Sequence, residues 1–255
     1  MSKIRNVLLI SESRKFEANL SQCLVEECGC KTFLRNEIRT IVLDDFIKTN
    51  NIEAIILNLL YERKKQKEEI DLILKQNVKK IIILENGNDL YLNCKIKPPF
   101  SVYKKLQIKN RQSRLMKLNE DTIQKSNIDF TIFRVSELYG PHVHSGLIFD
   151  LLTKRKVMLR RGTRDFVYEG DVIRAIEIAL ETNSVGIFDI ASGNAVDTKD
   201  LVDLINKCRK DPVKVKWKRR NDISYNCENF KFYKWQPIVN VKTGLFTIKR
   251  FKPFL

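Results

Sequence analysis

The sequence predicts an α/β fold: a Rossmann-like, doubly wound parallel sheet followed by a smaller C-terminal lobe. Short apolar runs suited to buried parallel strands recur through the first half of the chain. Between them lie stretches whose apolar residues repeat at helical spacing, and this alternation is typical of βαβ units. With 255 residues, 43% hydrophobic and 31% charged, the chain is also long and apolar enough to bury a core.

The expected elements alternate regularly up to residue 135. We expect parallel strands in five apolar runs, at residues 7–10, 30–34, 54–60, 78–84 and 130–135. Helical periodicity lies between them, at residues 16–27, 41–48, 62–77 and 114–124. Gly29 is placed to end the first helix as a C-cap. Residues 92–110 interrupt the pattern with two prolines and five lysines but no acidic residue, so we expect a surface loop there.

Two more helices are expected in the second half of the chain. Apolar residues recur at helical spacing through residues 171–182. Asp171 is the expected N-cap of this helix, because a carboxylate can accept from the free N–H groups of a first turn. A second helix is expected at residues 196–208, opened by Asp197 and Thr198.

The chain is strongly basic, with a formal net charge of +16 and a pI near 9.6. Such a field favours polyanions and acidic partners. The alternative is a Lys- and Asn-rich source proteome, in which the charge has no function of its own. No apolar run approaches the ~20 residues that cross a bilayer, and the first residues lead directly into a strand, so a cytoplasmic protein without a membrane span or signal peptide is expected.

No metal site is expected. The six cysteines are scattered in a chain without an export signal, and are expected to be reduced thiols. Cys23, Cys28 and Cys30 match no zinc spacing, and no distal pair completes them. His142 and His144 lack an evident third ligand, so solvated loop histidines are the expectation.

The second half of the chain contains four short sequence motifs. They read R-V-S-E-L-Y-G-P at residues 134–141, R-D-F-V-Y-E-G-D-V at 164–172, G-I-F-D-I-A-S-G at 186–193, and W-Q-P at 235–237 followed by G-L at 244–245. Together they resemble the NAD-dependent epimerase/dehydratase family, the extended short-chain dehydrogenases/reductases. Each block alone is weak, whereas their order and spacing make the resemblance specific.

The resemblance implies a domain division and a ligand class. Residues 1–140 would form a Rossmann-like domain and residues 141–255 a smaller substrate-type lobe, with residues 186–192 returning to the main sheet. The family implies NAD(P) as cofactor and a nucleotide sugar as substrate. The first half of this chain matches the family in its hydrophobic pattern but lacks the residues that carry its chemistry, which implies a degenerate member.

The glycine-rich turn that cradles a dinucleotide is missing. Aligning residues 7–10 with the family's first strand puts Ser11, Arg14 and Glu17 at the three glycine positions. Those glycines permit a tight turn and a close approach of the backbone to the pyrophosphate. Glu17 adds bulk and negative charge there, although Ser11 and Arg14 could hold a lone phosphate at the helix N-terminus. The sequence therefore leaves open whether a cofactor binds, since the family resemblance implies NAD(P) but the residues of this turn disfavour its pyrophosphate.

The family's acid/base residues are missing as well. Its catalytic trio is a Ser or Thr after the fourth strand and a Tyr-x-x-x-Lys pair at the start of a helix, whose lysine lowers the pKa of the tyrosine. Counting back from Arg134 places Ser113 and Lys117 at the Tyr and Lys positions, and residues 85–91 contain no Ser or Thr. A serine hydroxyl is a far poorer general acid than a phenol. For Lys117 an ordinary helix lysine is the preferred interpretation.

The substrate-type lobe keeps more of its motif. Arg164 matches the arginine that the family directs at substrate phosphates, and Arg161 enlarges the positive patch. The alternative for Arg164 is a structural salt bridge to Asp165 or Asp171. Glu137 stands where the family has a substrate-facing asparagine, and it places a negative charge near the sugar site.

A basic strip lies at residues 213–220, where valines and a tryptophan alternate with lysines, so that the two kinds of side chain face opposite ways in a strand. The candidates for polyanion binding are Lys214, Lys216, Lys218, Arg219 and Arg220. The alternative is a solvated edge strand whose lysines block edge-to-edge pairing.

The sequence therefore predicts a degenerate epimerase/dehydratase-like protein without dehydrogenase activity, acting as a binding or structural subunit. Two alternatives stay open: an active NAD(P)-dependent nucleotide-sugar enzyme with an atypical cofactor site, and a basic RNA- or polyanion-associated protein. The partners considered are a nucleotide sugar, an acidic protein, an RNA, and a second copy of the chain or a larger complex.

Overall fold

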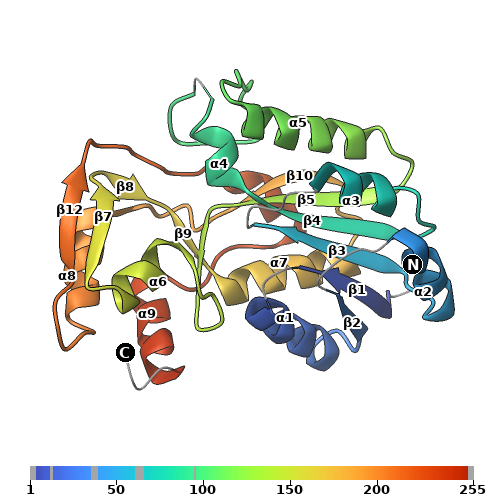
Figure 1. Cartoon of the computed structure of the whole chain (residues 1–255), viewed down its shortest axis with the longest axis horizontal. Coiled ribbons are helices and arrows are strands. Elements are labelled where there is room, and N and C mark those ends of the chain that lie inside the picture. Colours follow the sequence, from blue (N-terminus) through green and yellow to red (C-terminus); the bar gives the residue numbers. More distant parts are fainter. Residues whose placement is uncertain (1–3, 12–13, 36–39, 61–65, 95, 252–255) are drawn as a thin grey trace.

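A computed structural model describes residues 4–11, 14–35, 40–60, 66–94 and 96–251. Its centre is a six-stranded parallel sheet in the order β10-β5-β4-β3-β1-β2 (Figure 1). The strands are β1 (Asn6–Ile10), β2 (Lys31–Arg35), β3 (Ala54–Leu59), β4 (Lys80–Asn86), β5 (Asp129–Val135) and β10 (Gly186–Ile190). All six residues of β3 are buried, and all but Asn58 are apolar. The sheet confirms the predicted fold class.

Helices cover both faces of this sheet (Figure 1). The helices α1 (Arg14–Glu26) and α7 (Glu169–Glu181) share one apolar core with one face. The helices α2 (Thr40–Thr49), α3 (Gln66–Ile73) and α5 (Arg111–Gln124) share a second core with the other face. The sheet is therefore doubly wound. The start of the third helix as the sequence predicts it, residues 62–65, lies outside the described residues.

Other parts of the second half of the chain form a smaller lobe at one end of the sheet (Figure 1). It has a core of its own, shared by α6 (Gly146–Thr153), α8 (Thr198–Asn206) and α9 (Val241–Phe251). Three strand pairs complete it: β6 (Glu137–Tyr139) with β9 (Phe166–Tyr168), β7 (Lys156–Arg160) with β12 (Lys214–Lys218), and β8 (Thr163–Arg164) with β11 (Val196–Asp197). A short 3-10 helix, η1 (Glu228–Tyr233), precedes α9. The strand β10 leaves this half of the chain and pairs with β5 in the main sheet.

The prediction that Asp171 caps the following helix is wrong. The helix α7 begins at Glu169, so Asp171 is already inside its first turn. Its carboxylate oxygens instead accept hydrogen bonds of 3.0 and 3.1 Å from the backbone N–H groups of Ile238 and Val239. The donors come from a segment far along the chain, which local sequence reasoning does not see. Asp171 therefore anchors the C-terminal segment to α7.

The loop predicted at residues 92–110 is not confined to the surface. Phe100 is 2% exposed, and its ring stacks on that of Tyr91 with centroids 5.0 Å apart. Its backbone N–H donates to the carbonyl of Ser224 at 2.7 Å. The loop is therefore fixed to the core by an aromatic side chain between its lysines. None of the helices in the described ranges is long and apolar enough to span a membrane.

Candidate functional site

The first site residues lie where β1 ends and α1 begins. Ser11 is buried directly after β1, and Arg14 opens α1, while residues 12 and 13 lie outside the described part of the chain. Glu17 follows in the first turn of α1 and is only 4% exposed. Its Oε1 accepts a hydrogen bond of 2.6 Å from Nδ2 of Asn58, near the carboxyl end of β3. Glu17 therefore ties the start of α1 to a neighbouring strand.

This contact determines what the turn can bind. In a dinucleotide site, backbone N–H groups at the helix N-terminus face the pyrophosphate, and glycine leaves room for it. Here a carboxylate is buried in the first turn of the same helix, where it would meet a phosphate in poorly solvated surroundings. Its bulk and its charge both oppose a diphosphate. The residues present at this turn therefore do not fit the dinucleotide that the fold would otherwise hold there.

A row of three ionisable side chains crosses the carboxyl ends of neighbouring strands. In the sheet register Glu85 of β4 lies opposite Arg134 of β5, and Arg134 lies opposite Asp189 of β10. All three are buried. Side chains directly opposite one another project to the same face of a sheet. The row therefore faces α5, the helix that covers this side.

Arg134 connects the row to the loop and to the helix above it. Its Nε and Nη2 donate to the two carboxylate oxygens of Glu120 on α5, at 2.6 and 2.7 Å, in a bidentate pair. Its Nη1 donates to the Tyr91 hydroxyl at 2.9 Å, which donates to Oδ1 of Asp189 at 2.7 Å. The backbone N–H of Val102 donates to the other oxygen of Asp189 at 2.7 Å. One hydrogen-bonded network thus joins β5, β10, α5 and the loop.

Burial sets the protonation of this network. Desolvation, and next the neighbouring carboxylate of Glu120, raise the pKa of Glu85 well above its ordinary value. Burial and Glu120 thus favour the protonated form of Glu85, whose carboxyl group is hydrogen-bonded to Glu120. Desolvation also raises the pKa of Asp189 to about 6. Desolvation and Asp189 together raise the pKa of Tyr91, which is the opposite of the lowering that an acid/base tyrosine needs.

A small crevice, with about 10 Å³ of space for a water-sized molecule, opens beside the network. Glu85 and Asn86 line it from the end of β4, and Gln112 and Met116 line it from α5. One oxygen of Glu85, Oε2, is buried without a hydrogen-bond partner among the described residues. Gln112 and Met116 stand four residues apart, as the family's Tyr and Lys do. Neither an amide nor a thioether takes part in proton transfer near neutral pH.

Ser113 and Lys117, which the sequence motif places at the family's Tyr and Lys positions, do not line the crevice. The hydroxyl of the buried Ser113 donates to the carbonyl of Asp89 at 3.0 Å. The ammonium group of Lys117 lies 3.2 Å from a Glu120 carboxylate oxygen and 2.7 Å from one of Asp121. The lining of the crevice comes instead from the residues one position earlier on the helix. Neither glutamine nor methionine is a typical catalytic residue, so the sequence alone gives no reason to select Gln112 and Met116.

The lobe contributes a second group of candidate residues, around Arg164 in β8. Arg164 is half-buried, and burial lowers its pKa while Glu137 opposes the shift. Desolvation raises the pKa of Glu137, whose Oε1 accepts a hydrogen bond of 2.9 Å from the N–H of Leu147. The Nε of Arg164 is buried without a hydrogen-bond partner in the described ranges. Because this nitrogen is itself buried, an anionic ligand would reach it only if the surrounding side chains moved.

The two aspartates that the sequence offers as salt-bridge partners of Arg164 are engaged elsewhere. Asp165 accepts from the backbone N–H groups of Ser192 and Gly193 at 2.8 and 3.1 Å. Asp171 holds the C-terminal segment, as described above, and lies 3.2 Å from a guanidinium nitrogen of Arg174. Both carboxylates thus stabilise the lobe and leave Arg164 to other contacts.

The strip of basic residues lies at the outer side of the lobe. Lys214, Lys216 and Lys218 are exposed, while the residues between them pack against the core of the lobe, so the expected alternation is present. Arg161 lies over the ring of Trp217, 6.0 Å from its centroid. The strands β7 and β12 lie at one end of the molecule, away from β4 and α5, which contribute the residues of the crevice (Figure 1).

The remaining candidates are the histidines and cysteines. Nδ1 of His142 lies 2.7 Å from a carboxylate oxygen of Glu169, and Nζ of Lys15 lies 3.5 Å from the ring nitrogens of His144. The six cysteines are free thiols. No three His, Cys, Asp or Glu side chains of the described residues are close enough to hold a metal ion.

Comparisons with known proteins agree with this architecture. Residues 114–191 match the NAD dependent epimerase/dehydratase family, which confirms the resemblance carried by the motifs of the second half. The solved structure of UDP-glucose 4-epimerase from Thermotoga maritima, with UDP-glucose, superposes with a TM-score of 0.81 at 15% identity over 97% of this chain and 98% of that one. None of the curated protein sequences compared with this chain matches it.

Two further solved structures are similar over almost their whole length. The dTDP-glucose 4,6-dehydratase of Bacillus anthracis, in complex with NAD, has a TM-score of 0.78 at 16% identity over 98% of this chain and 96% of that one. The ADP-L-glycero-D-manno-heptose-6-epimerase of Helicobacter pylori has a TM-score of 0.77 at 15% identity, over 99% and 97%. At such identities the likeness establishes the fold, and function has to be argued from the site.

Proposed function

We propose that this chain, which has the fold of the extended short-chain dehydrogenases/reductases, has lost dehydrogenase chemistry and acts as a binding or structural subunit. The observation that carries the proposal is the hydrogen bond between Glu17 and Asn58. It secures a buried carboxylate in the first turn of the helix whose N-terminus would otherwise face a coenzyme diphosphate.

The crevice beside the network supports the same conclusion. Hydride chemistry on a sugar needs an acid/base group with a pKa near the working pH. Gln112 and Met116, which line the crevice, cannot supply one. Tyr91 is fully buried, its hydroxyl is hydrogen-bonded to Arg134 and Asp189, and its pKa is raised. The residues that replace the family's machinery are suited to packing and to hydrogen bonding.

The ligand best suited to the lobe is a nucleotide-linked sugar. The guanidinium of Arg164 keeps a buried donor without a partner among the described residues, and a guanidinium fork binds phosphate oxygens well. The Thermotoga maritima epimerase of the same fold was solved with UDP-glucose. We infer that a nucleoside diphosphate group contacts Arg164, while Glu137 beside it alters the site for the sugar.

One observation favours the rival function, an active nucleotide-sugar enzyme with an atypical cofactor site. Burial and Glu120 raise the pKa of Glu85, which lines the crevice and has one oxygen without a hydrogen-bond partner in the described part of the chain. A carboxylic acid kept neutral by burial can donate a hydrogen bond or a proton to a substrate. This group would serve in place of the missing tyrosine.

A thermal-shift series tests the proposal. A ligand at 100 times its dissociation constant stabilises a protein by roughly 2.7 kcal/mol, which raises the Tm by several degrees for a chain of this size. We expect no shift with NAD⁺, NADH, NADP⁺ or NADPH. We expect a shift with UDP-glucose or dTDP-glucose that is absent in Arg164→Gln and kept in Arg155→Gln, where the arginine is exposed.

The outcomes separate the two functions. A dinucleotide-dependent rise in Tm, together with an absorbance change at 340 nm when a nucleotide sugar is added, would establish the enzyme and exclude the proposal. A shift with nucleotide sugar alone supports a binding subunit. No shift with any of these ligands would remove Arg164 as a ligand contact and leave the structural role.

A further inference from the structure

Two segments of the lobe are strongly basic. Residues 154–164 contain six basic and no acidic residues, and residues 207–220 contain eight basic residues and one acidic residue. These two segments together carry a formal charge of +13, and residues 92–110 and 229–255 carry a further +5 and +6. Basic residues are therefore frequent along much of the chain. What distinguishes these two segments is how the fold places them.

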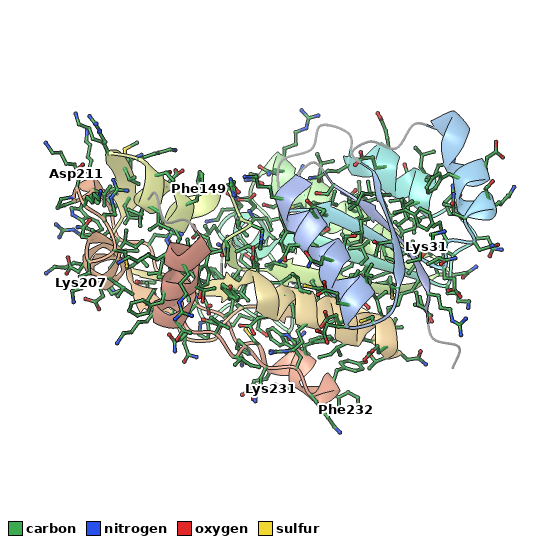
Figure 2. The ribbon with its side chains drawn as sticks, turned by 90° about the horizontal axis from the view of Figure 1, so that it is seen from below. Lys31, Phe149, Lys207, Asp211, Lys231 and Phe232 are labelled. Atoms are coloured by element: carbon green, nitrogen blue, oxygen red, sulfur yellow. The ribbon has the colours of Figure 1, made fainter. Side chains whose placement is uncertain are left out.

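The fold brings the two segments together as neighbouring strands. The strand β12 pairs in parallel with β7, with Lys214 opposite Lys156, Lys216 opposite Met158 and Lys218 opposite Arg160. All six of these side chains are exposed, whereas Val157 and Leu159 between them are buried in the core of the lobe. Figure 2 shows nitrogen-tipped side chains projecting from this end of the lobe, where Lys207 and Asp211 are labelled.

We call the basic face the exposed side of this two-stranded sheet, defined by Lys156, Arg160, Lys214, Lys216 and Lys218. Like charges directly opposite each other in a sheet are destabilising, by roughly 0.2–1 kcal/mol for a pair. Two of the three opposed pairs carry like charges. Within the described part of the chain, none of the five basic groups forms a salt bridge that would offset the repulsion. The opposed like charges of the basic face therefore lower the stability of the free chain.

A partner with closely spaced negative charges would offset this cost. Alternate residues of one strand are about 6.6–6.8 Å apart, and neighbouring strands are about 4.8 Å apart. Three successive exposed positions therefore span ~13 Å along the face. One strand of a nucleic-acid duplex carries a phosphate every ~3.4 Å, so the face matches about four phosphates in succession.

The composition of the basic face argues against other partners. A stable protein interface has an apolar or aromatic centre that excludes water, and here Met158 is the one apolar side chain among the six. Insertion into a lipid surface likewise needs apolar side chains beside the basic ones. No aromatic side chain lies on this face to stack on a base, because Trp217 points to the opposite side of β12.

We propose that the basic face binds the sugar–phosphate backbone of a nucleic acid without reading its sequence. The contacts are ion pairs of five or more lysines and arginines with successive phosphates, and Arg155 and Arg219 extend the surface at its edges. Arg220 contributes less, because its guanidinium is paired with Asp222 at 2.9 Å. This inference names a partner for the proposed binding subunit, but it concerns a surface remote from Glu17 and Glu85.

The test measures binding of a labelled 30-nucleotide RNA and a 30-base-pair DNA of random sequence by fluorescence anisotropy at several salt concentrations. For the wild-type chain we expect log K to fall with log salt with a slope of about −4.5 for the duplex DNA and about −3.5 for the single-stranded RNA, as five phosphate contacts give. The triple variant Lys214→Gln, Lys216→Gln, Lys218→Gln should bind at least tenfold more weakly at 0.15 M salt. Its slope should be smaller by about 3.

A matched triple variant controls for net charge. Lys48, Lys75 and Lys125 are exposed lysines of the Rossmann-like part, so their replacement by Gln lowers the charge equally without touching the basic face. It should bind RNA and DNA as the wild type does. Replacing Lys214, Lys216 and Lys218 by Arg should preserve binding, and thermal melting checks that every variant is folded.

Three results would overturn the inference. They are wild-type binding weaker than 0.1 mM at 0.15 M salt, equal losses in the two Gln triples, and tighter binding to vesicles with 30% phosphatidylserine than to either nucleic acid. The first two show that the charge has no local function, and the last assigns the surface to a membrane. None of them bears on dinucleotide binding, so the loss of dehydrogenase chemistry is judged separately.

Discussion

Arg134 and Glu120 form a buried bidentate ion pair that joins β5 to α5, with nitrogen–oxygen distances of 2.6 and 2.7 Å. The two residues are 3% and 0% exposed. Such a pair is costly to desolvate, and once it is buried each charge depends on the other. The pair therefore fixes how α5 lies on the sheet, beside the crevice that Gln112 and Met116 line.

Replacing Glu120 by Ala should lower the free energy of unfolding by about 3–5 kcal/mol, because the Arg134 guanidinium would remain buried without its carboxylate. Urea denaturation followed by circular dichroism measures the change. Asp121→Asn is the matched control, since Asp121 pairs with Lys117 on the solvent side of α5 and such pairs are worth at most about 1 kcal/mol. A similar small effect for both variants would show that the buried pair is not formed.

Glu85→Gln should make the chain more stable at pH 8 and leave it unchanged near pH 4.5. The pKa of Glu85 is raised in the folded chain, so the folded state holds a proton that the unfolded state releases. Stability is therefore lost as the pH rises from the unfolded pKa, about 4.3, towards the folded one. Gln is neutral at every pH and can still donate a hydrogen bond to Glu120, so the variant should not lose stability as the pH rises. In the wild type that loss amounts to about 1.4 kcal/mol for each unit by which folding raises the pKa of Glu85.

The measurement for Glu85 is a series of urea unfolding curves from pH 4.5 to pH 8. Glu228→Gln is the control, because the Glu228 side chain is 71% exposed and its removal should leave the pH dependence as it is in the wild type. If Glu85→Gln followed the wild-type curve at every pH, Glu85 would carry a charge at neutral pH and the rival enzyme would lose its proposed acid.

Asn58→Ala should destabilise the chain by about 1.5–3 kcal/mol, the range for a hydrogen bond to a charged group. The substitution removes the Nδ2 donor that lies 2.6 Å from Glu17 and the Oδ1 acceptor that lies 2.9 Å from the N–H of Leu60. Thermal melting compares it with Asn183→Ala, a change at an exposed asparagine. An unchanged Tm in Asn58→Ala would remove the contact on which the argument against a dinucleotide depends.

Gly162→Ala should destabilise the lobe more than Gly193→Ala does. Both glycines have positive φ, 114° and 70°, so alanine is strained at either position. At Gly162 an added Cβ would also lie 2.6 Å from the carbonyl oxygen of Asn221 and from Oδ1 of Asp222, whereas nothing lies within 4 Å of it at Gly193. We expect about 1–2 kcal/mol for Gly193→Ala, and a further 1–3 kcal/mol for Gly162→Ala. Chemical denaturation of the two variants decides between equal and unequal effects.

The regular part of the fold was predictable from the sequence because its signals are local. The strand β3 is buried on both faces and apolar except for Asn58, and Gly29 ends the first helical segment with a φ of 64°. The contacts of Asp171 and Phe100 were not predictable in this way. Asp171 accepts from Ile238 and Val239, and Phe100 packs on Tyr91, so tertiary partners override the local preferences for a cap and for a surface loop.

The candidate site was likewise predictable only in its local features. The absence of glycine at Ser11, Arg14 and Glu17 was visible in the sequence, but the partner of Glu17 across the sheet was not. Counting from a motif locates a helix but does not resolve neighbouring positions on it. The crevice is therefore lined by Gln112 rather than by the residue after it.

The pairing of β7 with β12 also determines when the lobe can form. Two parallel strands need a long crossover, and here the chain between them contributes α7 and the edge strand β10 to the main sheet before it returns. Contacts between such distant segments close slowly, so this outer ribbon should assemble among the last steps of refolding. Recovery of nucleic-acid binding in a stopped-flow experiment would then follow completion of the whole molecule, later than the signal from its helices.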